Sequence, residues 1–169
     1  MTRATSTGPG RPTEADLVAD LVRLVRRQWP VRALGQEVRS HGRCRTDACF
    51  LLRDGGVAPP LLLGAEAKLS DWARAVAQAT MNRYAVDLSY VAMPNARVSG
   101  ALLEYARRHG VGVLAVGRDR LEVAQPAVRN TADPVLRARV LFQLAVVRAR
   151  GAEPTSLLSA RPVQAPGAA

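Results

Sequence analysis

The chain has 169 residues, of which 48% are hydrophobic, and this is enough for one domain with its own core. Its formal charge of +10 favours a polyanionic partner such as nucleic acid, although a coding bias towards arginine would give the same charge. Its two cysteines, Cys44 and Cys49, are too few for a disulfide framework, and no Cys/His spacing suits a zinc site.

The two ends of the chain differ in composition from the middle. Residues 1–12 are rich in Thr, Gly and Pro and predict a flexible leader, whereas residues 151–169 are rich in Ala, Pro and Ser and predict a disordered tail. We therefore expect one domain over residues 13–150. The leader lacks the apolar core of a signal peptide, and no apolar run approaches the ~18 residues of a membrane span, so we expect a cytoplasmic protein without a membrane partner.

The domain is expected to begin with a helix over residues 14–28. Thr13 and the acidic residues after it resemble a capping box, and apolar residues recur at helical spacing at Leu17, Leu21 and Leu24. The helix should stop at Trp29, because a residue that precedes a proline avoids the helical conformation.

The next part of the chain predicts three sequential strands, over residues 34–40, 44–53 and 60–68, which suggest an antiparallel meander. A helix over residues 71–84 should follow, with Ser70 as its N-cap. Its apolar side would pack, and its polar stripe consists of Arg74, Gln78 and Asn82.

The remaining elements alternate. We expect a strand, a helix, a buried strand, a short partner strand and a final helix, over residues 88–93, 99–109, 111–116, 121–124 and 133–149. A strand, helix and strand in succession predict a parallel crossover. The expected fold is therefore α/β (α+β), with a mixed central β-sheet flanked by helices and a core order of α-β-β-β-α-β.

Three charged residues stand out within the predicted strands. Glu66 and Lys68 are two residues apart at the end of a strand and should share one face, and Lys68 is the only lysine among 24 Lys and Arg. Asp47 interrupts an apolar stretch of the neighbouring strand, where a carboxylate needs a partner. Asp47 and Glu66 could together bind a hard divalent cation, Mg²⁺ or Mn²⁺, and Lys68 could orient a water or neutralise developing charge.

An Asp followed by Glu-x-Lys between strands, and then by a helix that carries Gln, resembles the PD-(D/E)XK nuclease superfamily, which has the restriction-endonuclease-like fold. The resemblance implies that Asp47 and Glu66 bind the metal, that Lys68 assists the attacking water and that Gln78 supports the site. Glu37 matches an auxiliary acid of some branches. Thr46 stands where the proline of the family name would be, as in many members.

The wider layout is most similar to proposed DNA-repair endonucleases of the MmcB type. The shared features are Lys-x-Ser, a Tyr at the end of the helix and an Asp before the next strand, here Lys68, Ser70, Tyr84 and Asp87. The resemblance covers about residues 13 to 123. It implies a magnesium-dependent nuclease that acts on DNA, in repair, processing or defence.

The leading hypothesis is therefore a nuclease, with four arginines as candidate phosphate contacts: Arg39, Arg43, Arg45 and Arg74. The alternative from another class is a nucleic-acid-binding module on the same fold that does not cleave. For the charged cluster itself the alternative is an incidental salt bridge at a strand end, and for Gln78 a solvated helix face. A homodimer is one arrangement that would let so small a domain cut both strands of a duplex. A small-molecule-binding α/β domain is disfavoured, because Gly110-Val111-Gly112 precedes a strand instead of following one.

Overall fold

The structure, a computed structural model, describes residues 12–42, 44–53 and 59–151. The predicted leader and tail lie outside these residues, apart from Pro12 and Gly151. Among the described residues, no helix combines the length and the apolar character that a membrane crossing requires.

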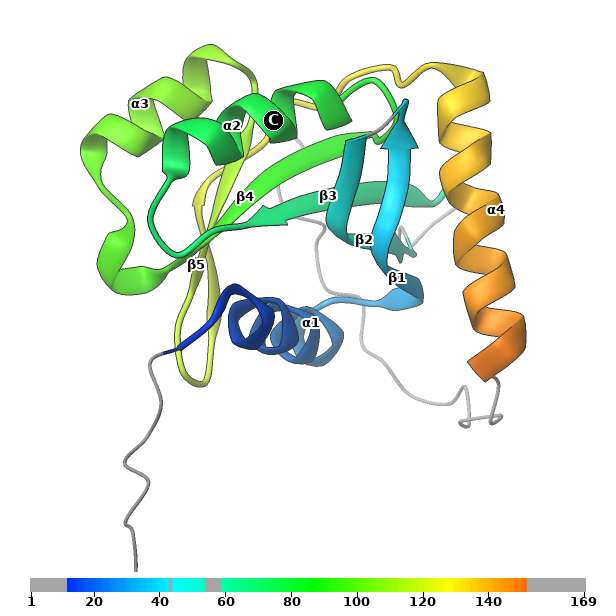
Figure 1. Ribbon diagram of the computed structural model, residues 1–169, viewed down its shortest axis with the longest axis horizontal. Helices are drawn as coiled ribbons and strands as arrows, with labels where there is room; N and C mark the ends of the chain where they lie inside the picture. Colours follow the sequence, from blue (N-terminus) through cyan, green and yellow to red (C-terminus); the bar gives the residue numbers. More distant parts are fainter. Residues whose placement is uncertain (1–11, 43, 54–58, 152–169) are drawn as a thin grey trace, which may run out of the picture.

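The centre of the domain is a mixed sheet of six strands whose spatial order follows the chain (Figure 1). Its first three strands form the predicted antiparallel meander, β3 to β5 are parallel, and β6 returns antiparallel to β5. The prediction of a mixed sheet is confirmed. The strands are β1 (Val31–His41), β2 (Cys44–Leu52), β3 (Leu61–Ala67), β4 (Leu88–Pro94), β5 (Gly112–Val116) and β6 (Leu121–Gln125).

Helices cover both faces of the sheet. In Figure 1, α1 lies below it, α2 and α3 lie above it, and α4 stands beside β1. The helices are α1 (Glu14–Gln28), α2 (Trp72–Asn82), α3 (Gly100–Arg108) and α4 (Pro134–Gly151), with a short 3-10 turn, η1 (Asn95–Arg97), before α3. Every predicted element is present, and most bounds agree within two residues; β1 instead begins three residues earlier than expected.

Helix α1 begins and ends where the sequence predicts. Thr13 is its N-cap, and the side chains of Thr13 and Asp16 each accept a hydrogen bond from the other's backbone N–H, which forms a capping box. Its apolar stripe, Leu17, Leu21, Leu24 and Val25, is buried against the sheet. The capping box therefore fixes the end of α1 that carries Glu14.

The start of α2 differs from the prediction. Asp71, and not Ser70, is the N-cap, because the Asp71 carboxylate accepts a hydrogen bond from the Arg74 backbone N–H at 3.2 Å. Ser70 contributes its carbonyl oxygen instead, which accepts from Trp72 N–H at 2.7 Å. Both residue types cap well, so composition alone could not choose between them.

Every residue of β3 is buried, and the strand separates two cores. Leu63, Ala65 and Ala67 belong to the core between α1 and the sheet, whereas Leu62 packs with residues of α4 on the other face. Because side chains alternate along a strand, Glu66 lies on the face opposite α1, which is covered by α2. A carboxylate thus stands within an apolar, fully covered strand.

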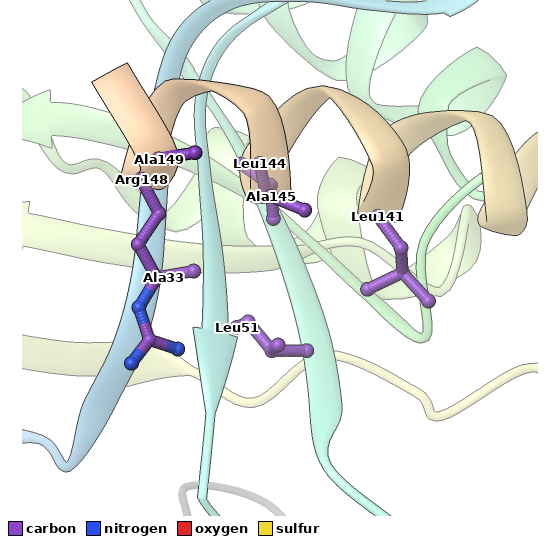
Figure 2. Close-up of a pocket in the computed structure, with 7 residues that line it drawn as sticks. All are labelled: Ala33, Leu51, Leu141, Leu144, Ala145, Arg148 and Ala149. Carbon is purple, nitrogen blue, oxygen red and sulfur yellow. The ribbon is translucent and has the colours of Figure 1, made fainter. Parts of the chain in front are cut away.

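Helix α4 packs on the edge of the sheet, chiefly against β1. A cavity of about 390 Å³ lies beneath its C-terminal half (Figure 2). The lining is apolar apart from one guanidinium and consists of Ala33, Leu51, Leu141, Leu144, Ala145, Arg148 and Ala149. None of the candidate site residues lines this cavity.

Candidate active site

The site lies where β2 and β3 separate. Their register is regular from Leu52 opposite Leu61 to Ala48 opposite Ala65, and ends there. Beyond this pair a side chain replaces the backbone as the hydrogen-bond acceptor: Asp47 Oδ2 accepts a hydrogen bond from the Ala67 backbone N–H at 2.8 Å. A carboxylate thus replaces a backbone acceptor at the point where the strands part, beside Glu66.

Glu66 is buried, with 1% of its surface exposed, and only half of its carboxyl group is satisfied. Its Oε1 accepts a hydrogen bond from Asn82 Nδ2 of α2 at 2.5 Å. Its Oε2 is buried and has no hydrogen-bond partner. In the ionised form of Glu66, Oε2 is therefore an acceptor that the fold leaves unsatisfied, and such a buried atom costs about 1–3 kcal/mol.

Burial is the largest cause of a raised pKa in both carboxyl groups. Burial first, and then the charge of Asp47, raise the pKa of Glu66 to about 8. Burial also raises the pKa of Asp47, although the Ala67 N–H and the charge of Lys68 oppose the shift. Two carboxyl groups are therefore held together at a free-energy cost that a bound cation would offset.

Lys68 lies just past the end of β3, and its side chain is 17% exposed. Burial alone would lower the pKa of Lys68, but the hydrogen bond to Glu14 and the charges of Asp47, Glu14 and Glu66 outweigh it and raise the pKa. Its Nζ donates to Glu14 Oε2 at 2.7 Å. Lys68 therefore stays an ammonium at neutral pH, which makes it a proton donor and a positive charge, and excludes it as a general base.

Gln78, on α2, also has a side-chain oxygen without a partner. Its Oε1 is buried and has no hydrogen-bond partner. Residues four apart on a helix share a face, so Gln78 lies on the face of α2 that Asn82 turns towards Glu66. Its site role stays a prediction.

Three contributors to the site were not predicted from the sequence: Glu14, Ser40 and Asn82. The sequence places Glu14 only at the start of a helix, and Asn82 only on a polar stripe, one turn after Gln78. The four-residue spacing from Gln78 is the feature of the sequence from which a site role for Asn82 could have been predicted. Ser40, on β1, had no signal, because its contact with Asn82 joins residues 42 positions apart.

The predicted outer residues lie in different surroundings. Glu37 and Arg45 are exposed and form an ion pair at 3.3 Å, and the charge of Glu37 contributes to the raised pKa of Asp47. Glu37 has a φ of 52°, a left-handed conformation that is uncommon for a residue other than glycine. Arg39 and Arg74 are exposed, and Arg43 lies outside the described residues. These arginines stay candidate contacts.

The oxygens at this site suit a hard divalent cation. Two carboxylates and an amide oxygen are ligands of the type that Mg²⁺ and Mn²⁺ accept, and Mg²⁺ usually keeps several waters beside one or two carboxylates. In the described part of the chain, no three His, Cys, Asp or Glu side chains form a metal-binding group. The unpartnered Glu66 Oε2 is an oxygen of the type that a magnesium-like ion accepts.

Comparison with known proteins bears on the fold alone. No protein-family model and no curated protein matches the chain. A solved structure with a similar fold is the SPO1766 protein of unknown function from Silicibacter pomeroyi, with a TM-score of 0.59 and 18% sequence identity. The match covers 85% of this chain and 94% of that one.

Proposed function

We propose that the protein is a metal-dependent nuclease that hydrolyses phosphodiester bonds in DNA, with Asp47 and Glu66 as the ligands of Mg²⁺ or Mn²⁺. The observation that carries this proposal is the buried Glu66 Oε2, which has no partner and lies beside a second carboxylate. An incidental salt bridge would pair each carboxylate with a cation. Lys68 instead binds Glu14, and Asn82 satisfies only one oxygen of Glu66.

Each residue would have a distinct role. Asp47 and Glu66 would hold the ion, which when bound polarises the scissile phosphate and lowers the pKa of a water, and Gln78 would support the site. The Lys68 ammonium would neutralise charge that develops on the phosphate and donate a hydrogen bond to the attacking water. Glu14 holds Lys68 in place from the capped start of α1.

The charge of the whole protein supports a nucleic-acid substrate. The formal charge of +10 would attract a phosphate backbone, and the exposed Arg74 lies on the first turn of α2, near the end of β3. Cys44 and Cys49 are free thiols, which agrees with a cytoplasmic location. A homodimer would place two such sites on one duplex.

The second candidate function is a DNA-binding module that does not cleave, and the same charge favours it. A labelled DNA duplex incubated with the full chain decides between the two. We expect cleavage with Mg²⁺ or Mn²⁺, none with EDTA, and a loss of roughly a thousandfold in Asp47→Asn, because a catalytic metal supplies several kcal/mol. Wild-type protein that binds the duplex and never cuts it would favour the binding module. Protein that neither binds nor cuts would refute both.

A further inference from the structure

A buried chain of hydrogen bonds reaches the candidate site from β1. Ser40 is fully buried, and its Oγ donates to Asn82 Oδ1 at 2.8 Å. Asn82, the last residue of α2, is 1% exposed and donates from Nδ2 to Glu66 Oε1. Side chains from β1, α2 and β3 are thus joined in one line behind the carboxyl group of Glu66.

The hydrogen bonds of this chain all run from donor to acceptor in one direction, from Ser40 to Asn82 to Glu66. An amide can turn either its oxygen or its nitrogen towards a neighbour, and only the nitrogen can donate to a carboxylate. Because Ser40 donates to Oδ1, the Asn82 nitrogen is left facing Glu66. The other acceptor within reach of the Ser40 hydroxyl, the Cys44 carbonyl, is 3.5 Å away, so Asn82 is the closer partner.

The consequence for Glu66 is that its two oxygens differ. Asn82 saturates Oε1, and Oε2 stays without a partner. A carboxyl group held at one oxygen cannot rotate freely about its last bond, so the direction of the other oxygen is fixed as well. Neither Ser40 nor Asn82 needs to touch the metal or the DNA for this effect.

We propose that Ser40 and Asn82 are positioning residues, which orient the carboxyl group of Glu66 so that Oε2 alone is offered to the divalent cation. This inference rests on the proposed metal site. Groups that orient a metal ligand contribute about 10–100-fold to metal affinity. Loss of either hydrogen bond should therefore weaken Mn²⁺ binding although both metal-binding carboxylates remain.

The chain provides a matched control for Ser40. Ser89 on β4 is also fully buried, and its Oγ also donates one hydrogen bond to α2, at 2.7 Å to the Ala79 carbonyl. Ser40→Ala and Ser89→Ala thus remove the same atom and one short hydrogen bond of similar burial. Only the Ser40 bond continues to Glu66.

The experiment is calorimetric titration of Mn²⁺ into the full chain, with circular dichroism melts to compare stability. The proteins are wild type, Ser40→Ala, Asn82→Ala, the double variant and Ser89→Ala. We expect Ser40→Ala and Asn82→Ala each to lose about 10–100-fold in affinity. The double variant should lose little more than Asn82→Ala, because both changes act on one line of contacts. Ser89→Ala should bind as wild type, whatever its stability.

Each outcome has a separate meaning. If wild type binds Mn²⁺ and Ser40→Ala binds equally well, the positioning role is refuted and the metal site stands. If Ser89→Ala loses as much affinity as Ser40→Ala, the effect is general loosening of the fold, which also refutes the role. If wild type binds no Mn²⁺, the metal site itself fails. Should Asn82→Ala not fold, the comparison of the two serine variants decides alone.

Discussion

Asp87 and Glu66 lie at opposite ends of the parallel pair β3 and β4, and their carboxyl groups differ in how many hydrogen-bond partners they have. Asp87, just before β4, is 9% exposed, and both of its oxygens have partners. Arg137 of α4 donates to both, at 3.0 and 2.9 Å, and Leu62 N–H donates to Oδ2 at 2.8 Å. Glu66, four residues after Leu62, is more deeply buried and has one oxygen without a partner.

The difference separates a structural carboxylate from a candidate functional one. A buried charge that is paired on every side ties elements together, and here Asp87 fastens α4 to the start of β3. A buried carboxyl group that is left half-satisfied beside a second one destabilises the empty fold. Such arrangements are concentrated at functional sites. Substitutions at the two ends should therefore affect different properties.

Breaking the paired end, Asp87 with Arg137, should destabilise the fold strongly at neutral pH. Arg137→Ala leaves Asp87 buried without its cation and should destabilise the fold by about 3 kcal/mol, the low end for a broken buried pair, because Arg137 is partly exposed. Urea denaturation would measure this. Arg139→Ala, at an exposed position on the same helix, should stay within about 0.5 kcal/mol of wild type. Equal effects of the two variants would contradict a structural role for the pair.

Removing the charge of Glu66 should instead increase stability at high pH. The folded-state pKa of Glu66, about 8, is above its ordinary value of 4.5, so the folded state holds a proton that the unfolded state releases. The contribution of Glu66 to stability is complete below about pH 4.5 and is lost as the pH rises to about 8, at up to about 1.4 kcal/mol per pH unit. Without metal, Glu66→Gln should remove this loss and be the more stable protein at pH 8.

Urea denaturation of both proteins between pH 5 and 9 is the measurement, and the quantity of interest is their difference in unfolding free energy. A difference independent of pH would contradict the raised pKa. Added Mn²⁺ should restore wild-type stability at high pH and leave Glu66→Gln unchanged, since metal binding requires the ionised carboxylate.

How far the sequence predicts this contrast depends on how local each signal is. The capping box at Thr13 and the helical spacing of Leu17, Leu21 and Leu24 follow from neighbours in the chain, and the structure confirms them. Period-2 alternation also places Glu66 on the face of α2. These signals were enough to predict the sheet and to select the candidate carboxylates.

The partners of the carboxylates follow from tertiary packing instead. The two-residue spacing predicts that Lys68 shares a face with Glu66, but it does not predict the hydrogen bond from Lys68 Nζ to Glu14, 54 residues earlier. The pairing of Asp87 with Arg137 spans 50 residues. No periodicity within either segment encodes such contacts, so they needed the folded structure.

A kinetic prediction tests whether Lys68 is more than the partner of Glu14. If the two form only an ion pair, Lys68→Arg should cleave as wild type does, because arginine pairs equally well with a carboxylate. If Lys68 orients the attacking water, the larger planar guanidinium should reduce cleavage by about a hundredfold. Single-turnover cleavage of a labelled duplex measures this, with DNA affinity as the control, which should hardly change. Full activity in Lys68→Arg would remove the catalytic role.

The smallest expected effect concerns DNA binding at the two ends of the sheet. Arg74→Ala should weaken binding a few-fold and make the slope of log affinity against log salt shallower by about 0.9, the value for one lost phosphate contact. Arg129 is the control. It is exposed and adjoins Asn130, whose N–H donates to the Asp87 carbonyl, so Arg129 lies at the end of the β3–β4 pair away from Glu66. Arg129→Ala should leave the slope unchanged. Fluorescence anisotropy at several salt concentrations measures these slopes. Equal slopes for Arg74→Ala and Arg129→Ala would show that the DNA-binding face is not at the site.

The central claim is that the unpaired oxygen of Glu66 exists for a metal ion, and calorimetry with Mn²⁺ tests it most directly. The titration compares wild type with Glu66→Gln and Asp47→Asn, which keep the shape of each side chain and remove its charge. We predict that wild type binds Mn²⁺ and that both variants bind far more weakly, while Arg139→Ala binds as wild type. Equal Mn²⁺ affinity in wild type and Glu66→Gln would contradict the claim.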